Sequence, residues 1–240
     1  MADDNKPIKY ARYAIGEIIL VVIGILIALQ INTWNEERKT RLIETKTLKE
    51  IRENLHVDIK EISSDIEVMD SIDNAGKAAI DYLNINTKPS ESFKYDIHVS
   101  KQNPHFDPNR GGYSLLVSKG LDIVTNDSLR GAISRLYELD YPYYAKYENE
   151  RVSLLINNLN PKLTNYFSFF WVDDNYFNGT SEISEADFLK LKEDFSIINA
   201  LNNAISRNKM VQNRAIRIRG YMLALIAQIE EELEKKEKLI

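Results

Sequence analysis

The 240-residue sequence contains no cysteine, and this absence excludes several kinds of chemistry at once. Without a thiol the chain forms no disulfide, no thiolate nucleophile and no cysteine-ligated zinc or iron–sulfur centre. Proline and glycine are scarce, with 6 and 9 residues respectively. Neither residue interrupts the stretch from Trp34 to Ala75, so one long helix is compatible with that part of the chain.

An excess of positive charge is also missing. The formal net charge is -5, so the composition gives no reason to expect nucleic acid as a partner. The usual hydrolase, nucleotide-binding and zinc-protease motifs do not occur. The spacing of His98, His105 and Asp107 matches no strong metal-binding template. We therefore predict no enzyme activity, no catalytic residue, no cofactor and no metal site.

One long hydrophobic run stands out in this otherwise ordinary composition. From Tyr13 to Ile31 only Gly16, Glu17, Gly24 and Gln30 interrupt the apolar residues. A helix of this length spans the hydrocarbon core of a bilayer, which is about 30 Å thick. No small-residue cleavage site follows the run, and the middle is apolar on every side, unlike a signal peptide or an amphipathic core helix. Residues 13–33 are thus predicted to be an uncleaved transmembrane helix after a leader, residues 1–12.

Polar and small residues inside this run have three interpretations: self-association of the helix, the water boundaries of a monomeric anchor, and an ion path lined by Glu17. Gly16, Gly24 and Ala28 fall near one helical face and would let a second helix approach closely. The predicted contact that uses this face includes seven residues: Gly16, Glu17, Gly24, Ala28, Gln30, Asn32 and Trp34. Polar groups in a membrane favour protein partners, so self-association is the preferred interpretation. In the alternative, Glu17, Gln30 and Asn32 only mark the water boundaries of a monomeric anchor.

Two stretches carry a resemblance to a known family. They are "YAIGEIILVVIGILIALQINTWNEERK" (13–39) and "GGYSLLVSKGLDIVTNDSLRGAISRLYE" (111–138). Both resemble motifs of a family of uncharacterised bacterial single-pass membrane proteins. The resemblance implies an inner-membrane protein whose C-terminal part is periplasmic, although the short leader "MADDNKPIKYAR" departs from the basic leader of that family. It implies no activity and no catalytic residues.

Helical periodicity dominates the remainder. Apolar residues recur at helical spacing from Leu48 to Met69 and again from Val211 to Leu233. The first pattern predicts a stalk helix over 34–84 and the second a C-terminal helix over 201–240, packed together as an antiparallel, coiled-coil-like hairpin. Acidic residues in 61–73 and basic residues in 207–219 suggest a register that sets residue 67 beside about 213. That register also brings the C-terminus near residue 40.

Residues 85–200 are predicted to form a loop and a small helical cap, so the fold class is all-α. Residues 84–112 read as a long loop in which "FKYDIHV" alternates like a strand. Short helices are expected before Gly120, after an N-cap at Asn126 or Asp127, and after the capping-box sequence "SEAD" (184–187). A further helix begins near Pro142 and should stop or kink at Pro161.

Two aromatic groups are candidates for a partner or ligand surface. The predicted surface residues are Tyr141, Tyr143, Tyr144, Phe169, Phe170 and Trp171. Core packing of the cap explains the same rings equally well or better. The sequence as a whole predicts a membrane-anchored helical scaffold or accessory protein that forms homo-oligomers, with the lipid bilayer and other envelope proteins as partners. The alternative is a ligand-sensing module that acts through a partner protein.

Overall fold

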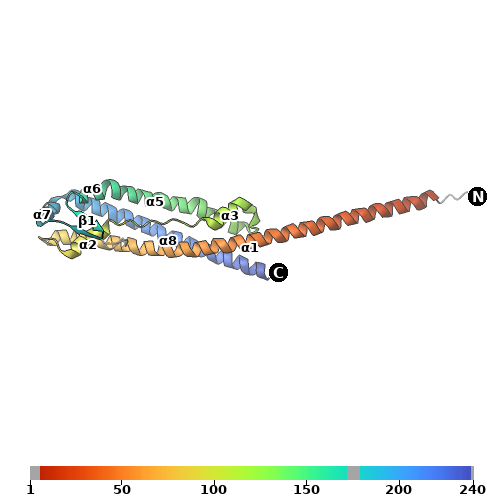
Figure 1. The fold of residues 1–240 in the computed structure, drawn as a ribbon, viewed down its shortest axis with the longest axis horizontal. Helices are drawn as coiled ribbons and strands as arrows, with labels where there is room; N and C mark the ends of the chain where they lie inside the picture. The colour runs from red at the N-terminus through yellow and green to blue at the C-terminus, as the bar shows by residue number, and fades with distance from the viewer. Residues whose placement is uncertain (1–5, 172–178, 239–240) are drawn as a thin grey trace, which may run out of the picture.

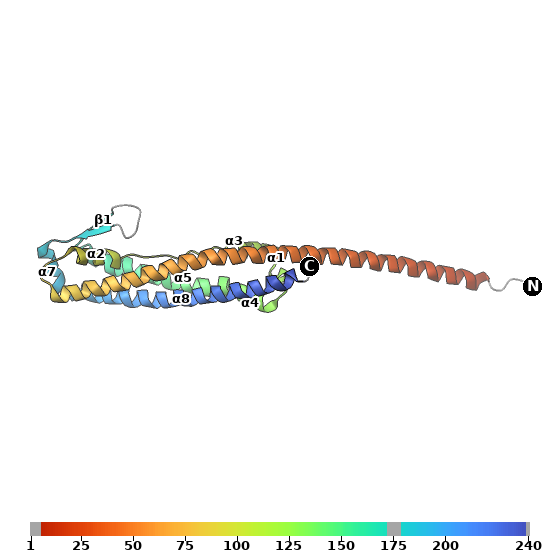
Figure 2. The ribbon, with the colours of Figure 1, turned by 90° about the horizontal axis from the view of Figure 1, so that it is seen from below.

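A computed structural model describes residues 6–171 and 179–238. Two long helices dominate it: α1 (Lys6–Ile85) and α8 (Phe195–Glu237). They run antiparallel, and the first part of α1 projects from one end of the folded body (Figures 1 and 2). The last part of α8 lies near the point where α1 leaves the body (Figure 1). The predicted helical hairpin is confirmed, with α8 starting at 195 rather than 201.

The register between α1 and α8 is fixed by contacts along the pair. Gln212 Nε2 donates to the Ile66 carbonyl at 3.0 Å, and Lys236 Nζ lies 2.8 Å from a Glu44 carboxylate oxygen. These contacts confirm the predicted alignment of 67 with about 213 and of the C-terminus with residue 40. The two charged segments do not pair with each other among the described ion pairs, and Arg207 instead contacts Glu150. The buried apolar stripes of both helices meet in one core cluster, so the register follows from them and from these contacts and not from pairing of the two charged segments.

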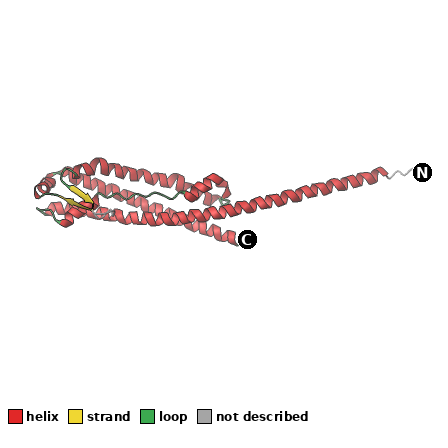
Figure 3. Cartoon of the chain, in the orientation of Figure 1, coloured by secondary structure: helices red, strands yellow, loops and turns green. Residues whose placement is uncertain are grey.

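The elements between the two long helices form a third layer and close the far end of the hairpin (Figure 1). In chain order they are α2 (Glu91–Ser100), α3 (Gly111–Lys119), η1 (Leu121–Ile123), α4 (Asp127–Arg135), η2 (Leu136–Asp140), α5 (Tyr141–Leu154), η3 (Leu155–Leu159), α6 (Asn160–Leu163), β1 (Ser168–Trp171), β2 (Gly179–Glu182) and α7 (Glu185–Glu193). The region expected as a cap thus extends back along the hairpin. Within residues 6–171 and 179–238 the chain is helical apart from loops and two short antiparallel strands (Figure 3).

The predicted helix ends are confirmed where capping chemistry is clear. Asn126 Oδ1 accepts a hydrogen bond from the Leu129 amide, and Ser184 Oγ accepts one from the Asp187 amide. Gly120 ends α3 with φ 95°, a left-handed conformation that favours glycine. The helix around Pro161 continues to Leu163 and accommodates the proline after the π-helical segment η3.

The strand predicted from "FKYDIHV" is wrong, because this segment is helix α2. The Ser90 hydroxyl caps it by accepting from the Phe93 amide at 3.2 Å. Phe93 and Ile97, four residues apart, are both buried in the far half of the core. The cap and the burial of two side chains on one face thus favour a helix over the strand that the alternating pattern suggested. Because α2 lies within it, the predicted loop of 84–112 is shorter than expected.

Candidate functional site

The residues predicted for membrane contact all lie on the projecting part of α1. Residues 15–39 are exposed throughout, so Gly16, Glu17, Gly24, Ala28, Gln30, Asn32 and Trp34 contact no other element of the fold. A Cβ added at Gly16 or Gly24 would meet nothing within 4 Å. One helix among the described residues, this one, is long and apolar enough to cross a membrane by length and composition. Part of the predicted leader, residues 1–5, lies outside the described residues.

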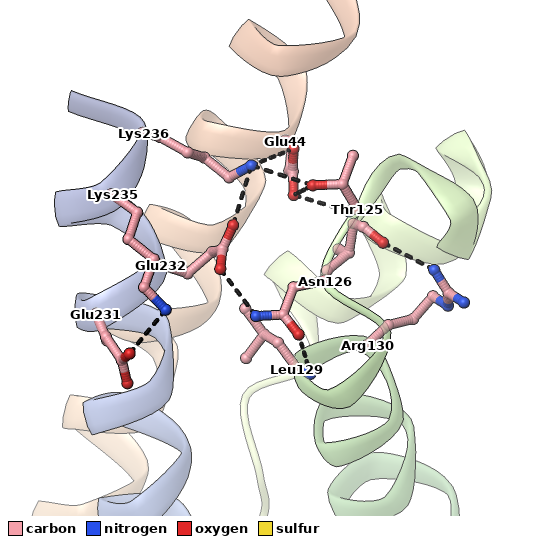
Figure 4. Close-up of polar contacts among 10 residues, drawn as sticks. Glu44, Thr125, Asn126, Leu129, Arg130, Glu231, Glu232, Lys235 and Lys236 are labelled. Carbon is pink, nitrogen blue, oxygen red and sulfur yellow. Dashed lines mark hydrogen bonds and ion pairs between the residues drawn. The ribbon is translucent and has the colours of Figure 1, made fainter. Parts of the chain in front are cut away.

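A polar cluster stands where α1 enters the body, and we call it the basal cluster: Glu44, Thr125, Asn126, Glu232 and Lys236 (Figure 4). Glu44 on α1 is fully buried. Its carboxylate accepts from the Thr125 amide at 3.0 Å and from the Thr125 hydroxyl at 3.2 Å. Its other oxygen lies 2.8 Å from Lys236 Nζ on α8. One carboxylate thus joins three segments that are distant in the sequence.

The remaining members of the basal cluster tie the same segments a second time (Figure 4). Asn126 Nδ2 donates to Glu232 at 2.8 Å while its Oδ1 caps α4. Glu232 also lies 3.2 Å from Lys236. The bonds to Asn126 and Lys236 hold the pKa of Glu232 below its ordinary value against the opposing effect of burial. The arrangement holds a helix, a turn and a second helix at fixed positions.

An extended segment, residues 102–110, forms the second polar region, and we call it the strap. The strap runs along α1 in the opposite direction and donates its backbone amides to acidic side chains. Asn109 N donates to Asp58 at 2.9 Å, and Asp107 N donates to Glu61 at 3.3 Å. The Tyr141 hydroxyl donates to the other Asp58 oxygen at 3.1 Å. Burial raises the pKa of Asp58 to about 6, although the hydrogen bonds from Asn109 and Tyr141 act to lower it.

Side chains of α5 hold the other side of the strap. Glu148 accepts from the Phe106 amide at 3.2 Å, and Arg151 donates to the Pro104 carbonyl. Arg151 also donates to Asn208 on α8 at 3.2 Å. Burial raises the pKa of Glu148 and lowers that of Arg151, while their mutual attraction opposes both shifts. These charged side chains hold the strap between α1 and α5, and Arg151 also connects α5 to α8.

The two histidines of the segment after α1, His98 and His105, lie in separate environments. His98 is buried on α2, where its Nε2 lies 3.0 Å from Gln102 Nε2. His105 is exposed and its Nδ1 lies 3.4 Å from Glu148. The described residues contain no group of three or more histidine, aspartate or glutamate side chains placed to hold a metal ion.

The predicted aromatic surface divides in the structure. Tyr141 and Tyr144 are buried in the core next to Phe106, so these two residues do not form an exposed surface. Tyr143 is exposed on α5, with its hydroxyl 3.1 Å from that of Tyr147. The other three candidates lie on β1: Phe169 is partly buried, and Phe170 and Trp171 are exposed.

Sequence reasoning missed the basal cluster and the acids under the strap, although a signal was present. Glu44 lies four residues before Leu48, in phase with the stripe that continues through Ile51 and Leu55. Asp58 continues the same spacing, three residues after Leu55. A carboxylate in phase with a buried apolar stripe indicates a buried polar contact, because such a group needs partners.

Comparison with known proteins places the chain in one family. Residues 17–204 match the model of a family described as a family of unknown function, DUF6090. The chain belongs to this family. No curated protein matches it, and no solved structure matches it.

Proposed function

We propose that this member of the family is a membrane-anchored helical scaffold or accessory protein without catalytic activity. In this proposal α1 spans the bacterial inner membrane once, the folded body is periplasmic, and copies associate through the membrane segment. Other envelope proteins are the expected partners of the body. One observation carries the proposal: α1 buries its apolar stripe from Leu48 onward but leaves every residue of 15–39 exposed.

The physical reason is the contrast between the two halves of one helix. Isoleucine, leucine and valine at the centre of a helix each favour insertion by about 0.3–0.6 kcal/mol. The segment from Ile15 to Ile31 consists mostly of such residues, and in water all of them would face solvent. A bilayer is the environment that removes this cost over the whole circumference of the helix.

Self-association is supported by the open small-residue face of the segment. Gly24 and Ala28 are four residues apart, and nothing lies within 4 Å of the Cβ position of Gly24. A second helix can approach closely there, and Glu17 and Gln30 then find polar partners away from lipid. In a monomer, Glu17 would have no protein partner in the membrane and would have to lie at the membrane–water interface.

The test has two parts. Full-length protein should stay in the membrane fraction after an alkaline carbonate wash, and a reporter fused after Ile240 should be active on the periplasmic side. Mass measurement in mild detergent should show an oligomer that Gly24→Leu dissociates. Val22→Leu is the matched control, because it enlarges a residue on another face of the same helix. If the protein is washed off the membrane, α1 is not a membrane anchor. If the protein is a monomer, or if Gly24→Leu and Val22→Leu have equal effects, copies do not associate through the face that contains Gly24.

A ligand-sensing module acting through a partner protein is the second candidate function. The observation that favours it is the continuity of α1, which is one helix from Lys6 to Ile85. A shift of the body can therefore be transmitted to the anchor without crossing a flexible linker. A ligand that raises the melting temperature of the full chain would support this function over a purely structural one.

A further inference from the structure

A cleft lies on the outer side of the body between the start of α5 and the middle of α8. Its volume is about 220 Å³. Buried Tyr144 and Ile218 belong to its lining, together with exposed Tyr143 and Tyr221. The charged lining residues are Asp140, Arg214 and Arg217. The cleft thus combines aromatic rings with two guanidinium groups and a single carboxylate.

The positive charges of the cleft are not neutralised by the fold. Among the ion pairs of the described residues none includes Arg214 or Arg217, whereas Asp140 lies 3.5 Å from Arg135. Arg214 stacks on the ring of Tyr147 with 3.5 Å to the centroid. Its Nη1 donates to the Met210 carbonyl at 3.4 Å. Because neither guanidinium is paired with a carboxylate among the described residues, Arg217 and the rest of the Arg214 guanidinium keep donors for an anion.

Size and lining restrict the class of ligand. Pockets for drug-sized molecules enclose about 300–1,000 Å³, so this cleft holds a single ring or a comparable group. A planar guanidinium matches the geometry of a carboxylate. Exposed Tyr143 and Tyr221 offer ring faces and hydroxyl groups, which suit a ligand with both carbon faces and hydroxyls.

We propose that the cleft between α5 and α8 binds a small acidic sugar, with the carboxylate on Arg217 and Arg214 and the sugar ring against Tyr143 and Tyr221. This inference names a ligand class for the ligand-sensing alternative. The binding itself does not depend on that function, whereas the biological consequence of binding does. Binding to the body does not require insertion of α1, so failure of the cleft and failure of the anchor give different results.

The experiment is calorimetric titration of full-length protein in mild detergent with glucuronate, and with glucose as the neutral control. Glucuronate should bind, glucose should not, and Arg217→Gln should weaken binding at least about tenfold, or about 1.4 kcal/mol. Arg219→Gln is the matched control, because Arg219 carries the same charge on α8 but contacts Ser63 and does not line the cleft. It should bind glucuronate as the unmodified protein does.

Four results would overturn the proposal. The first is that glucuronate binds no better than glucose. The second is an equal loss in Arg217→Gln and Arg219→Gln, which would mean that overall charge and not the cleft attracts the anion. The third is inorganic phosphate that binds as tightly as glucuronate, because the sugar ring would then contribute nothing. The fourth concerns Tyr221→Ala, which should also weaken the binding of glucuronate. An unchanged affinity of this variant would refute the placement of the sugar ring against Tyr221.

Discussion

Glu44→Gln tests the basal cluster most directly, because it removes one charge while keeping the shape of the side chain. The Glu44 carboxylate accepts from Thr125 twice and lies 2.8 Å from Lys236, whose side chain is only 12% exposed. Loss of one partner of a buried ion pair costs about 3–5 kcal/mol. Glu232 remains 3.2 Å from Lys236 and glutamine still accepts from Thr125, so we expect a smaller loss, about 2–3 kcal/mol.

The assay is urea unfolding of the full chain in mild detergent, followed by circular dichroism. Glu36→Gln is the matched control, since Glu36 lies on the same helix and pairs with Lys39 at the exposed surface. That change should cost no more than about 0.5 kcal/mol. Hydrogen exchange of the Thr125 amide should become faster in Glu44→Gln and stay unchanged in the control.

A second substitution separates charge from shape. In Lys236→Met the buried Glu44 loses its nearest cation, and the double variant with Glu44→Gln removes both charges. The double variant should recover about 1–2 kcal/mol relative to the sum of the single variants, because neither side chain is then left buried and uncompensated. If Glu44→Gln changes the free energy of unfolding by less than about 0.5 kcal/mol, the basal cluster does not hold α1 to the body.

Three further predictions test other contacts. Gly112→Ala should destabilise the fold by about 1–3 kcal/mol, because the new Cβ would lie 2.7 Å from the Ile51 nitrogen, while Gly131→Ala, with open space, should be neutral or stabilising in the same unfolding assay. The raised pKa of Asp58, about 6, means that the folded state binds more protons than the unfolded state between about pH 4 and pH 6, so stability should fall as pH rises through this window, by up to about 2–3 kcal/mol. Asp58→Asn should flatten that part of the pH profile, and an unchanged slope would contradict the assignment. Arg151→Met should lower the free energy of unfolding by about 3–5 kcal/mol, since it leaves buried carboxylates without their cation, and a loss below about 1 kcal/mol would refute that role.

The hairpin could be predicted from the sequence because its signal is repeated. Each turn of α1 and α8 adds another apolar residue in phase, so an error at one position does not change the result. The register was also predicted correctly, although from charges that do not pair among the described contacts. The stripes and the charges happen to favour the same alignment, and the stripes carry the buried area.

Short elements were predicted wrongly where the sequence contains weak patterns for both a helix and a strand. The segment of α2 alternates like a strand, and only the cap at Ser90 and the burial of Phe93 and Ile97 decide for a helix. Burial of this kind depends on the partners that the whole fold supplies, which a local pattern does not contain. The same holds for Tyr141 and Tyr144, for which the sequence allows either a surface or a core position and which lie in the core next to Phe106 of the strap.

The folded body extends past the end of the family match. The family match stops at residue 204, ten residues into α8, yet the core of the body continues well beyond it. Val211, Met222 and Ile229 are fully buried in the same cluster as Leu48 of α1. Lys236, near the end of α8, completes the contact with Glu44 at the point where α1 leaves the body. Because a shorter α8 would expose the stripe of α1 to water, the part of the chain after 204 belongs to the same folding unit as the part before it.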